Sequence, residues 1–265
     1  MKRIIYLFAV IALLSSCTLS DGTRTHDKDY VAKRSFRLVS EDIYNQLHVL
    51  SCAQTIELYE QATSDSARYA IEDKHLPSER LRKTATGWDV IRNGKPALSF
   101  GCDTPLNTPG SVWTVSVANY QEQITADQYW TIKCTAKNSW TIEKVVKYES
   151  HTITSTLYVK AMEELEDLRL SNGPIYKYEI TGNSCFDQNE EVVAPYKIEL
   201  DVKEPLILNA YHVYTSHRIA GIIDGVALMR VTDKSTGEFL VPPFRYFPRK
   251  LTVDPLIEYI STKLE

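Results

Sequence analysis

Cysteine is scarce in this chain, and its few cysteines lie far apart. The 265 residues include five, Cys17, Cys52, Cys102, Cys134 and Cys185. No two are separated by only about two to four residues, which excludes a compact zinc finger or zinc ribbon. The last four are an even number, so an oxidising compartment would permit two disulfides, with three connectivities. Cys134 also falls in the apolar phase of a strand-like segment, where a free thiol packs as a small hydrophobic group.

Long apolar runs and an excess of basic charge are missing as well. The apolar run at residues 4–14 is too short for a transmembrane helix, which needs ~20 residues. The 34 acidic residues outnumber the 30 basic ones, and this balance argues against a nucleic acid partner. The sequence has no nucleophile elbow, P-loop, zinc-protease helix motif or dinucleotide fingerprint. We therefore expect a protein that is not an enzyme and that has no cofactor.

The first seventeen residues contain the strongest functional signal. Two basic residues precede the apolar run, and small residues then lead to Cys17, an order typical of a cleaved signal peptide. The segment Leu14-Ser15-Ser16-Cys17 resembles the lipobox of bacterial lipoproteins. The resemblance implies that residues 1–16 are a signal peptide and that Cys17 is the lipid-modified first residue of the mature protein. The alternative is an ordinary secretory signal with a chance cysteine near its cleavage site.

A lipid-modified Cys17 would attach the protein to a membrane of the cell envelope through acyl chains such as palmitate. Two or more chains give stable attachment without a transmembrane helix. An Asp after the cysteine would resemble the inner-membrane retention signal, but Thr18 stands there, so the outer membrane is favoured over the inner. A periplasmic and a surface-facing orientation are both compatible with this sequence. Residues 17–35 are polar and charged and are predicted to form a flexible tether.

Residues 36–265 are predicted to form a single domain of the α+β class, mainly antiparallel β. Residues 36–76 are the only long stretch with helical periodicity; Ser40 is the expected N-cap, and residues 63–66 are expected to cap a second, shorter helix. A shorter stretch with helical spacing follows at residues 161–169. Residues 84–253 predict roughly nine to eleven antiparallel strands, as a sheet, a barrel or a half-barrel. Asp254 and Pro255 then predict the start of a short C-terminal helix.

Two local sequence patterns predict a turn and a strand of this sheet. Asn93-Gly94 separates two strand-like runs and predicts a hairpin with a type I′ turn, with Pro96 at an edge or beside a bulge. Residues 196–203 alternate apolar and charged side chains at every step, as expected for a sheet with one buried and one solvated face.

Aromatic residues supply the candidate ligand or partner surface. Trp113, Trp130 and Trp140 occupy the same position in three similar strand-like segments. They either line a concave ligand-binding face or pack into the core, and packing is the favoured interpretation. In the proline-flanked segment 242–250, Phe244, Arg245 and Tyr246 either present a patch for a protein or glycan partner or belong to an edge strand.

Metal-binding patterns are incomplete. His212 and His217 are five residues apart and would point to opposite faces of a strand, which argues against a shared metal ion. Asp187, Asn189 and Glu191 match the first half of a calcium loop, but Val192 stands where such a loop needs glycine. We therefore expect no metal site.

Three functional hypotheses follow. The first is a membrane-anchored envelope lipoprotein with a non-catalytic binding or scaffolding role. The second is a lipocalin-like carrier of a small hydrophobic ligand, a likeness of architecture alone because Gly87-Trp88 lacks the residue that separates these two in the lipocalin motif. The third is a cell-envelope hydrolase that uses carboxylates which the sequence does not identify.

Overall fold

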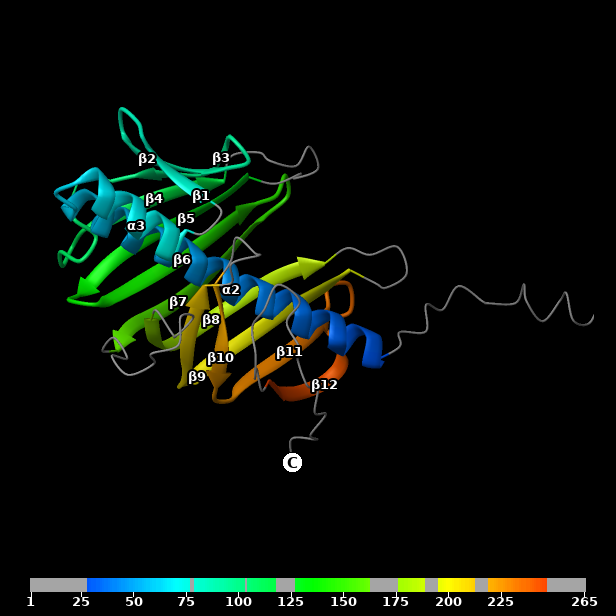
Figure 1. Cartoon of the computed structure of the whole chain (residues 1–265). Coiled ribbons are helices and arrows are strands. Elements are labelled where there is room, and N and C mark those ends of the chain that lie inside the picture. Colours follow the sequence, from blue (N-terminus) through cyan, green and yellow to red (C-terminus); the bar gives the residue numbers. More distant parts are fainter. Residues whose placement is uncertain are drawn as a thin grey trace, which may run out of the picture.

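The computed structural model describes residues 28–76, 79–102, 104–117, 127–162, 176–188, 195–212 and 219–246. Within these ranges the chain forms two helices and twelve strands (Figure 1). The helices are α2 (Lys28–Gln61) and α3 (Asp65–His75). The strands are β1 (Glu79–Lys83), β2 (Gly87–Arg92), β3 (Lys95–Gly101), β4 (Val112–Val117), β5 (Asp127–Ala136), β6 (Ser139–Lys147), β7 (Thr152–Met162), β8 (Tyr176–Gln188), β9 (Tyr196–His212), β10 (Ile219–Asp224), β11 (Ala227–Asp233) and β12 (Phe239–Tyr246). The predicted α+β class with mainly antiparallel strands is confirmed.

All twelve strands belong to one antiparallel sheet. Strands β1 to β9 pair in sequence order, and the path continues from β9 to β11 and β12. The long strand β9 uses residues 196–201 to pair with β11 and residues 207–212 to pair with β10. Among the described strands, β1 and β12 are the ends of the path and do not pair with each other, so the sheet is not closed. The path has eleven strands, and β10 adds a twelfth beside it.

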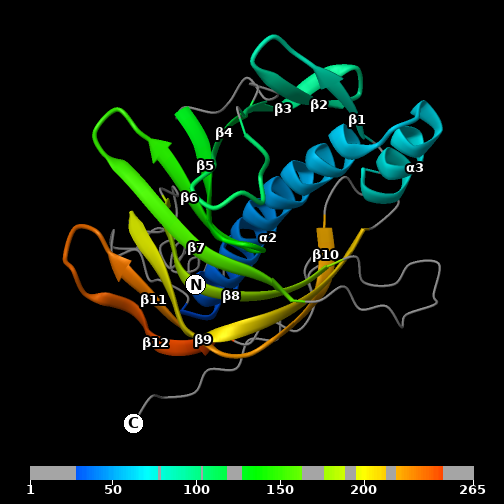
Figure 2. The same ribbon diagram turned by 90° about the vertical axis from the view of Figure 1, so that its left-hand side faces the viewer.

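Helix α2 lies against the concave side of this sheet, which curves around it (Figure 2). The helix contacts β6, β8, β9, β10 and β12. Its apolar side chains join those of the sheet in one buried core, and Phe36 stacks on Phe244 of β12 with 5.0 Å between ring centroids. Most of the helix from Asp42 to Ile56 is buried, polar residues included. The concave face is therefore occupied by protein.

A buried polar network fixes α2 against two strands. The Lys144 ammonium on β6 donates to Asp42 Oδ1 on the helix, while Ser184 of β8 and Gln46 of α2 each donate to Asp42 Oδ2 at 2.7 Å. Lys144 and Asp42 are both buried. Because an isolated buried charge is very unfavourable, these hydrogen bonds are what allow two charged groups to lie in the core.

The start of the first helix differs from the prediction. Residues 28–35, assigned to the tether from the sequence, form the first two turns of α2, and Val31, Ala32 and Ser35 are buried. Ser40 is a buried residue inside the helix and not its N-cap. The buried face of the helix continues before residue 36. Its side chains there are small and alternate with charged residues, so the hydropathy pattern of this segment does not indicate an amphipathic helix.

Several local predictions are confirmed. Ser64 caps α3, accepting a hydrogen bond from the Ala67 amide at 3.2 Å. The β2–β3 hairpin turns at Asn93 and Gly94, whose φ angles of 50° and 75° suit a type I′ turn, and a register shift lies beside Pro96. In residues 196–203 the apolar side chains are buried and the charged ones are not.

Some predictions fall outside the described residues. These are the signal peptide 1–16, Cys17 and the tether up to residue 27, and the C-terminal helix from Asp254. Neither described helix combines the length and the apolar character that crossing a membrane requires.

Candidate functional site

The three tryptophans of the predicted ligand surface belong to the core. Trp113, Trp130 and Trp140 expose only 1%, 4% and 2% of their surface. Two of the indole nitrogens donate to loop carbonyls, Trp113 to Thr104 and Trp140 to Leu106. These side chains therefore belong to the buried core on the inner face of the sheet and are not accessible to a ligand.

The aromatic segment near the C-terminus forms the edge strand β12. Phe244 is buried against Phe36 of α2, whereas Arg245 is exposed. The side chain of Tyr246 lies outside what the structure describes. Phe244 and Arg245 thus point to opposite faces and do not form one patch.

The four cysteines that the sequence left as possible disulfide partners, Cys52, Cys102, Cys134 and Cys185, are free thiols in the structure. Cys52 is on helix α2, Cys134 on β5 and Cys185 on β8, and Cys102 directly follows β3. Cys134 is buried, as predicted for a packed thiol, and donates to the Ala136 carbonyl at 3.1 Å.

The opposite face of the sheet contains a hollow of about 470 Å³ over strands β2 to β5. Trp88 and Trp113 are buried in the core, whereas Asp89 and Thr114, the residues that follow them, line the hollow. The lining residues are Thr84, Thr86, Asp89, Ser99, Phe100, Gly101, Thr114, Val115, Ser116 and Tyr129. Most of these side chains have hydroxyl groups, which can both donate and accept hydrogen bonds.

The hollow depends on a missing side chain at Gly101. A Cβ atom added there would lie 2.7 Å from Thr114 Oγ1, which is too close for an ordinary contact. Gly101 pairs with Thr114 across β3 and β4, so any larger residue at this position would project between the hydroxyl groups of the hollow.

Asp89 is the carboxylate of this surface, and its position is fixed by two partners. Arg82 donates to Oδ2 at 2.6 Å and Ser99 donates to Oδ1 at 2.7 Å. Burial alone would raise the pKa of Asp89, but these hydrogen bonds outweigh it, and the pKa is below its usual value. The hollow therefore presents an oriented, ionised carboxylate at neutral pH.

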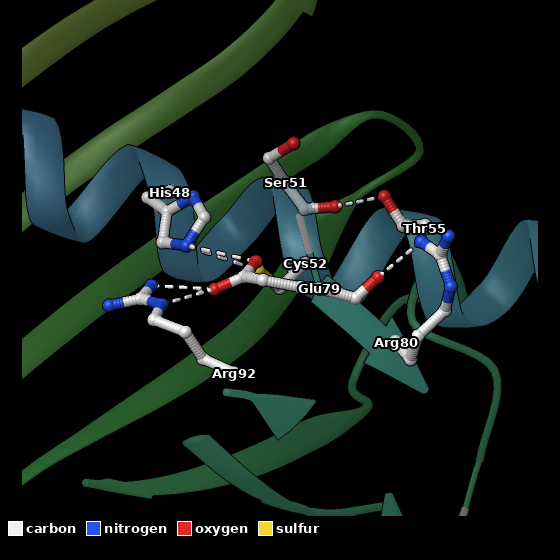
Figure 3. Close-up of polar contacts among 7 residues, drawn as sticks. All are labelled: His48, Ser51, Cys52, Thr55, Glu79, Arg80 and Arg92. Carbon is white, nitrogen blue, oxygen red and sulfur yellow. Dashed lines mark hydrogen bonds and ion pairs between the residues drawn. The ribbon is translucent and has the colours of Figure 1, made fainter. Parts of the chain in front are cut away.

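A second candidate site lies on the inner side of the sheet, where α2 meets β1 (Figure 3). His48 and Cys52 are one helical turn apart on α2, and Glu79 is the first residue of β1. Cys52 Sγ lies 3.6 Å from His48 Nε2, and Glu79 Oε2 lies 3.8 Å from the same nitrogen. All three side chains are buried, with exposed fractions of 7%, 0% and 2% for His48, Cys52 and Glu79.

Arg92 of β2 holds the other oxygen of Glu79. Its Nε and Nη2 atoms donate to Oε1 at 2.9 Å and 2.6 Å, which leaves Oε2 directed towards His48 (Figure 3). Burial, and then the negative charge of Glu79, raise the pKa of Cys52 well above its ordinary value, against the opposing effect of Arg92. Without another positive charge, Cys52 is a neutral thiol at physiological pH and a poor nucleophile.

A third group of titratable residues lies at the surface. Ser150 Oγ is 2.9 Å from His151 Nδ1, and His151 Nε2 is 2.5 Å from Asp187 Oδ2, while Lys234 also pairs with Asp187. Serine, histidine and aspartate are the residue types of a hydrolase triad, but Ser150 and His151 are adjacent exposed residues, and Lys234 already neutralises Asp187. Asp187 therefore links loops by ion pairs. Asn189, Glu191 and His217 and the side chain of His212 lie outside the described residues.

Sequence reasoning missed both the hollow and the buried cluster. The i, i+4 spacing of His48 and Cys52 was a usable signal, because residues four apart share a helix face. Glu79 lies 27 positions after Cys52, and it meets α2 because helix α3 leads the chain back towards α2. The sequence pattern does not predict this return. Likewise, Gly101 is significant only once β3 is seen to pair with β4.

The chain matches no known protein family, and neither curated proteins nor solved structures provide a match. The functional argument therefore rests on the sequence and on the geometry of these sites.

Proposed function

We propose that this protein is a lipid-anchored, non-catalytic binding protein of the bacterial cell envelope, and that its ligand is a glycan. The observation that carries this proposal is the hydroxyl-lined hollow on the sheet face opposite α2. Its volume of about 470 Å³ lies within the range of small-molecule sites, ~300 to 1,000 Å³.

The chemistry of the hollow suits a polyhydroxylated ligand. Sugar hydroxyls donate and accept hydrogen bonds, and Thr114 and Ser116 offer the same two functions. The Ser99 hydroxyl donates to Asp89 and can still accept a hydrogen bond from a ligand. The ionised carboxylate of Asp89 adds a strong acceptor, because hydrogen bonds to charged groups are about twice as strong as neutral ones. The half-buried Tyr129 ring supplies an apolar surface at the edge of the hollow for the C–H face of a sugar.

The carboxyl content of the hollow supports a binding function without catalysis. Glycoside hydrolysis generally uses two carboxyl groups on either side of the scissile bond, one of them protonated as the general acid. Among the described residues that line the hollow, Asp89 is the one carboxylate, and its pKa is lowered and not raised. This arrangement suits recognition better than bond cleavage.

The lipobox-like segment that ends at Cys17 supports a location beside envelope glycans. Eleven peptide steps separate Cys17 from the first residue of α2, Lys28, and such a length spans at most ~40 Å. A lipid on Cys17 would therefore keep the domain close to the membrane surface. In cells labelled with palmitate, the wild-type protein should take up label and remain with membranes, whereas Cys17→Ser should do neither.

The glycan proposal is tested by binding to an array of envelope polysaccharide fragments. We expect the wild-type protein to bind a subset of them and Gly101→Val, which fills the hollow, to lose at least tenfold in affinity. Asp89→Asn should weaken binding similarly, because it removes the charged acceptor but keeps the side-chain shape. Glu143→Gln is the matched control, since Glu143 is an exposed carboxylate on the same face outside the hollow. Equal binding by all four proteins, or no binding by the wild type, would contradict the proposal.

A further inference from the structure

We propose that His48, Cys52 and Glu79 form a binding site for a thiophilic divalent transition-metal ion, with zinc as the reference case. The site is separate from the hollow, because it lies between α2 and β1 on the inner side of the sheet (Figure 3). The proposal does not depend on the glycan function.

The donor set selects the class of metal. One imidazole nitrogen, one sulfur and one carboxylate oxygen are the three ligand types that zinc uses in proteins. Calcium and magnesium prefer sets composed of oxygen alone, so a site with sulfur and nitrogen disfavours them. The three side chains point towards one another from two elements, and each offers one ligand atom within 4.8 Å of the other two.

The distances fit a tetrahedral site. Bonds of about 2.0 to 2.3 Å at a tetrahedral angle place neighbouring ligand atoms about 3.3 to 3.6 Å apart. The sulfur of Cys52 is 3.6 Å from the Nε2 atom of His48, and Glu79 Oε2 is 3.8 Å from that nitrogen. Small side-chain movements would bring all three atoms to bonding distance. Three protein ligands leave one position of a tetrahedral site for a water molecule or hydroxide.

The surroundings of Glu79 match those of a metal ligand. Arg92 holds Oε1 with two hydrogen bonds and leaves Oε2 facing the histidine and the cysteine, as an outer-shell residue does when it orients a coordinating carboxylate. Arg80 also donates to the backbone carbonyl of Glu79 at 2.8 Å, which fixes the start of β1. A buried ion pair between Arg92 and Glu79 accounts for Oε1, and a metal ion would in addition account for the histidine nitrogen and the cysteine sulfur within 4.8 Å of Glu79's ligand oxygen.

Binding changes the charge of the cluster by one unit. The thiol proton of Cys52 leaves to solvent, and the thiolate cancels one of the two positive charges of a divalent ion. The Glu79 carboxylate already pairs with Arg92, so the cluster with its ion carries one net positive charge. An anion such as hydroxide as the fourth ligand would neutralise that charge.

Cobalt(II) is a suitable probe, because sulfur ligation gives it a charge-transfer absorption that zinc then abolishes by displacement. The full chain is used with Cys17→Ser, which removes the cysteine outside the described residues. We expect one equivalent of cobalt to bind and to show the sulfur-to-cobalt absorption. This absorption should disappear in Cys52→Ser. His48→Gln and Glu79→Gln should each weaken cobalt binding at least tenfold. Cys134→Ser, which alters another buried thiol, should behave as the parent protein.

A complementary variant covers the case in which Cys52→Ser does not fold. In this variant Cys102, Cys134 and Cys185 are replaced by serine, so that Cys52 is the remaining thiol, and the sulfur–cobalt absorption should persist. The proposal is overturned if the parent protein binds no cobalt, which would leave a buried ion pair only, or if the absorption survives in folded Cys52→Ser. Glycan binding by that same protein would be unaffected, which separates the two proposals.

Discussion

Individual polar side chains in this protein are positioned by partners that are distant in sequence or on another strand. Asp89 is held by Arg82 and Ser99 on the two neighbouring strands, and Glu79 by Arg92 on the adjacent strand. Because each carboxylate has a cationic partner, the two acids can be buried while ionised. Asp89 belongs to the surface hollow, where it can accept hydrogen bonds from a ligand, whereas Glu79 belongs to the buried cluster with His48 and Cys52.

The lowered pKa of Asp89 predicts a contribution to stability that depends on pH. Since the folded-state pKa lies below the unfolded one, the contribution is complete above the unfolded value, near pH 4, and is lost as pH falls through the folded pKa. The stability difference between the wild type and Asp89→Asn should therefore be largest at neutral pH and shrink below pH ~4. Urea unfolding at several pH values measures this difference, and one that is constant with pH would contradict the assignment.

The thiols give a second prediction at this scale. With Cys17→Ser, the unfolded protein should contain four titratable thiols, because the four remaining cysteines are free. In the folded protein Cys185 should react slowly near neutral pH, since burial, opposed by the nearby Lys197, raises its pKa to about 11. Thiol titration with and without denaturant provides the count. Two thiols or none in the unfolded, unreduced protein would indicate disulfides.

At the scale of elements, helix α2 depends on its buried polar contacts as well as on its apolar surface. Breaking a buried ion pair by removing one partner typically costs about 3 to 5 kcal/mol. Asp42→Ala should lower the free energy of unfolding by about that amount, because Lys144 would be left without its carboxylate. Urea denaturation measures the loss.

A matched control lies one residue away. Glu41 forms an exposed i, i+4 ion pair with Arg37 on the same helix, at 2.9 Å, and pairs of this kind contribute about 0.3 to 0.5 kcal/mol. Glu41→Ala should therefore change stability little. If Asp42→Ala were equally mild, α2 would be held by its apolar contacts alone.

The sequence predicted those turns, helix caps and strands whose conformation depends on residues close together in the chain. The Asn93-Gly94 turn depends on two residues with positive φ, the Ser64 cap on a bond to Ala67, and strand β9 on simple alternation. The start of α2 was not predictable, because Ala32 and Ser35 are buried only through contact with the rest of the fold. The cap assigned to Ser40 failed for the same reason.

At the scale of the whole molecule, one open sheet curves around one helix (Figures 1 and 2). This arrangement divides the sheet into an inner face filled by α2 and the three tryptophans, and an outer face available to solvent. The sequence indicated a two-faced sheet, but it did not show which element covers the inner face, because that depends on contacts between α2 and strands that begin 78 or more residues after the helix ends. The position of the binding surface follows from this division.

Hydrogen–deuterium exchange with and without a bound glycan tests the central claim most directly. We predict that the glycan slows exchange in β2 to β5 around the hollow and leaves α2 and β8 to β12 unchanged. Slower exchange in α2 with no change in β2 to β5 would contradict the account, because it would place the ligand on the inner face.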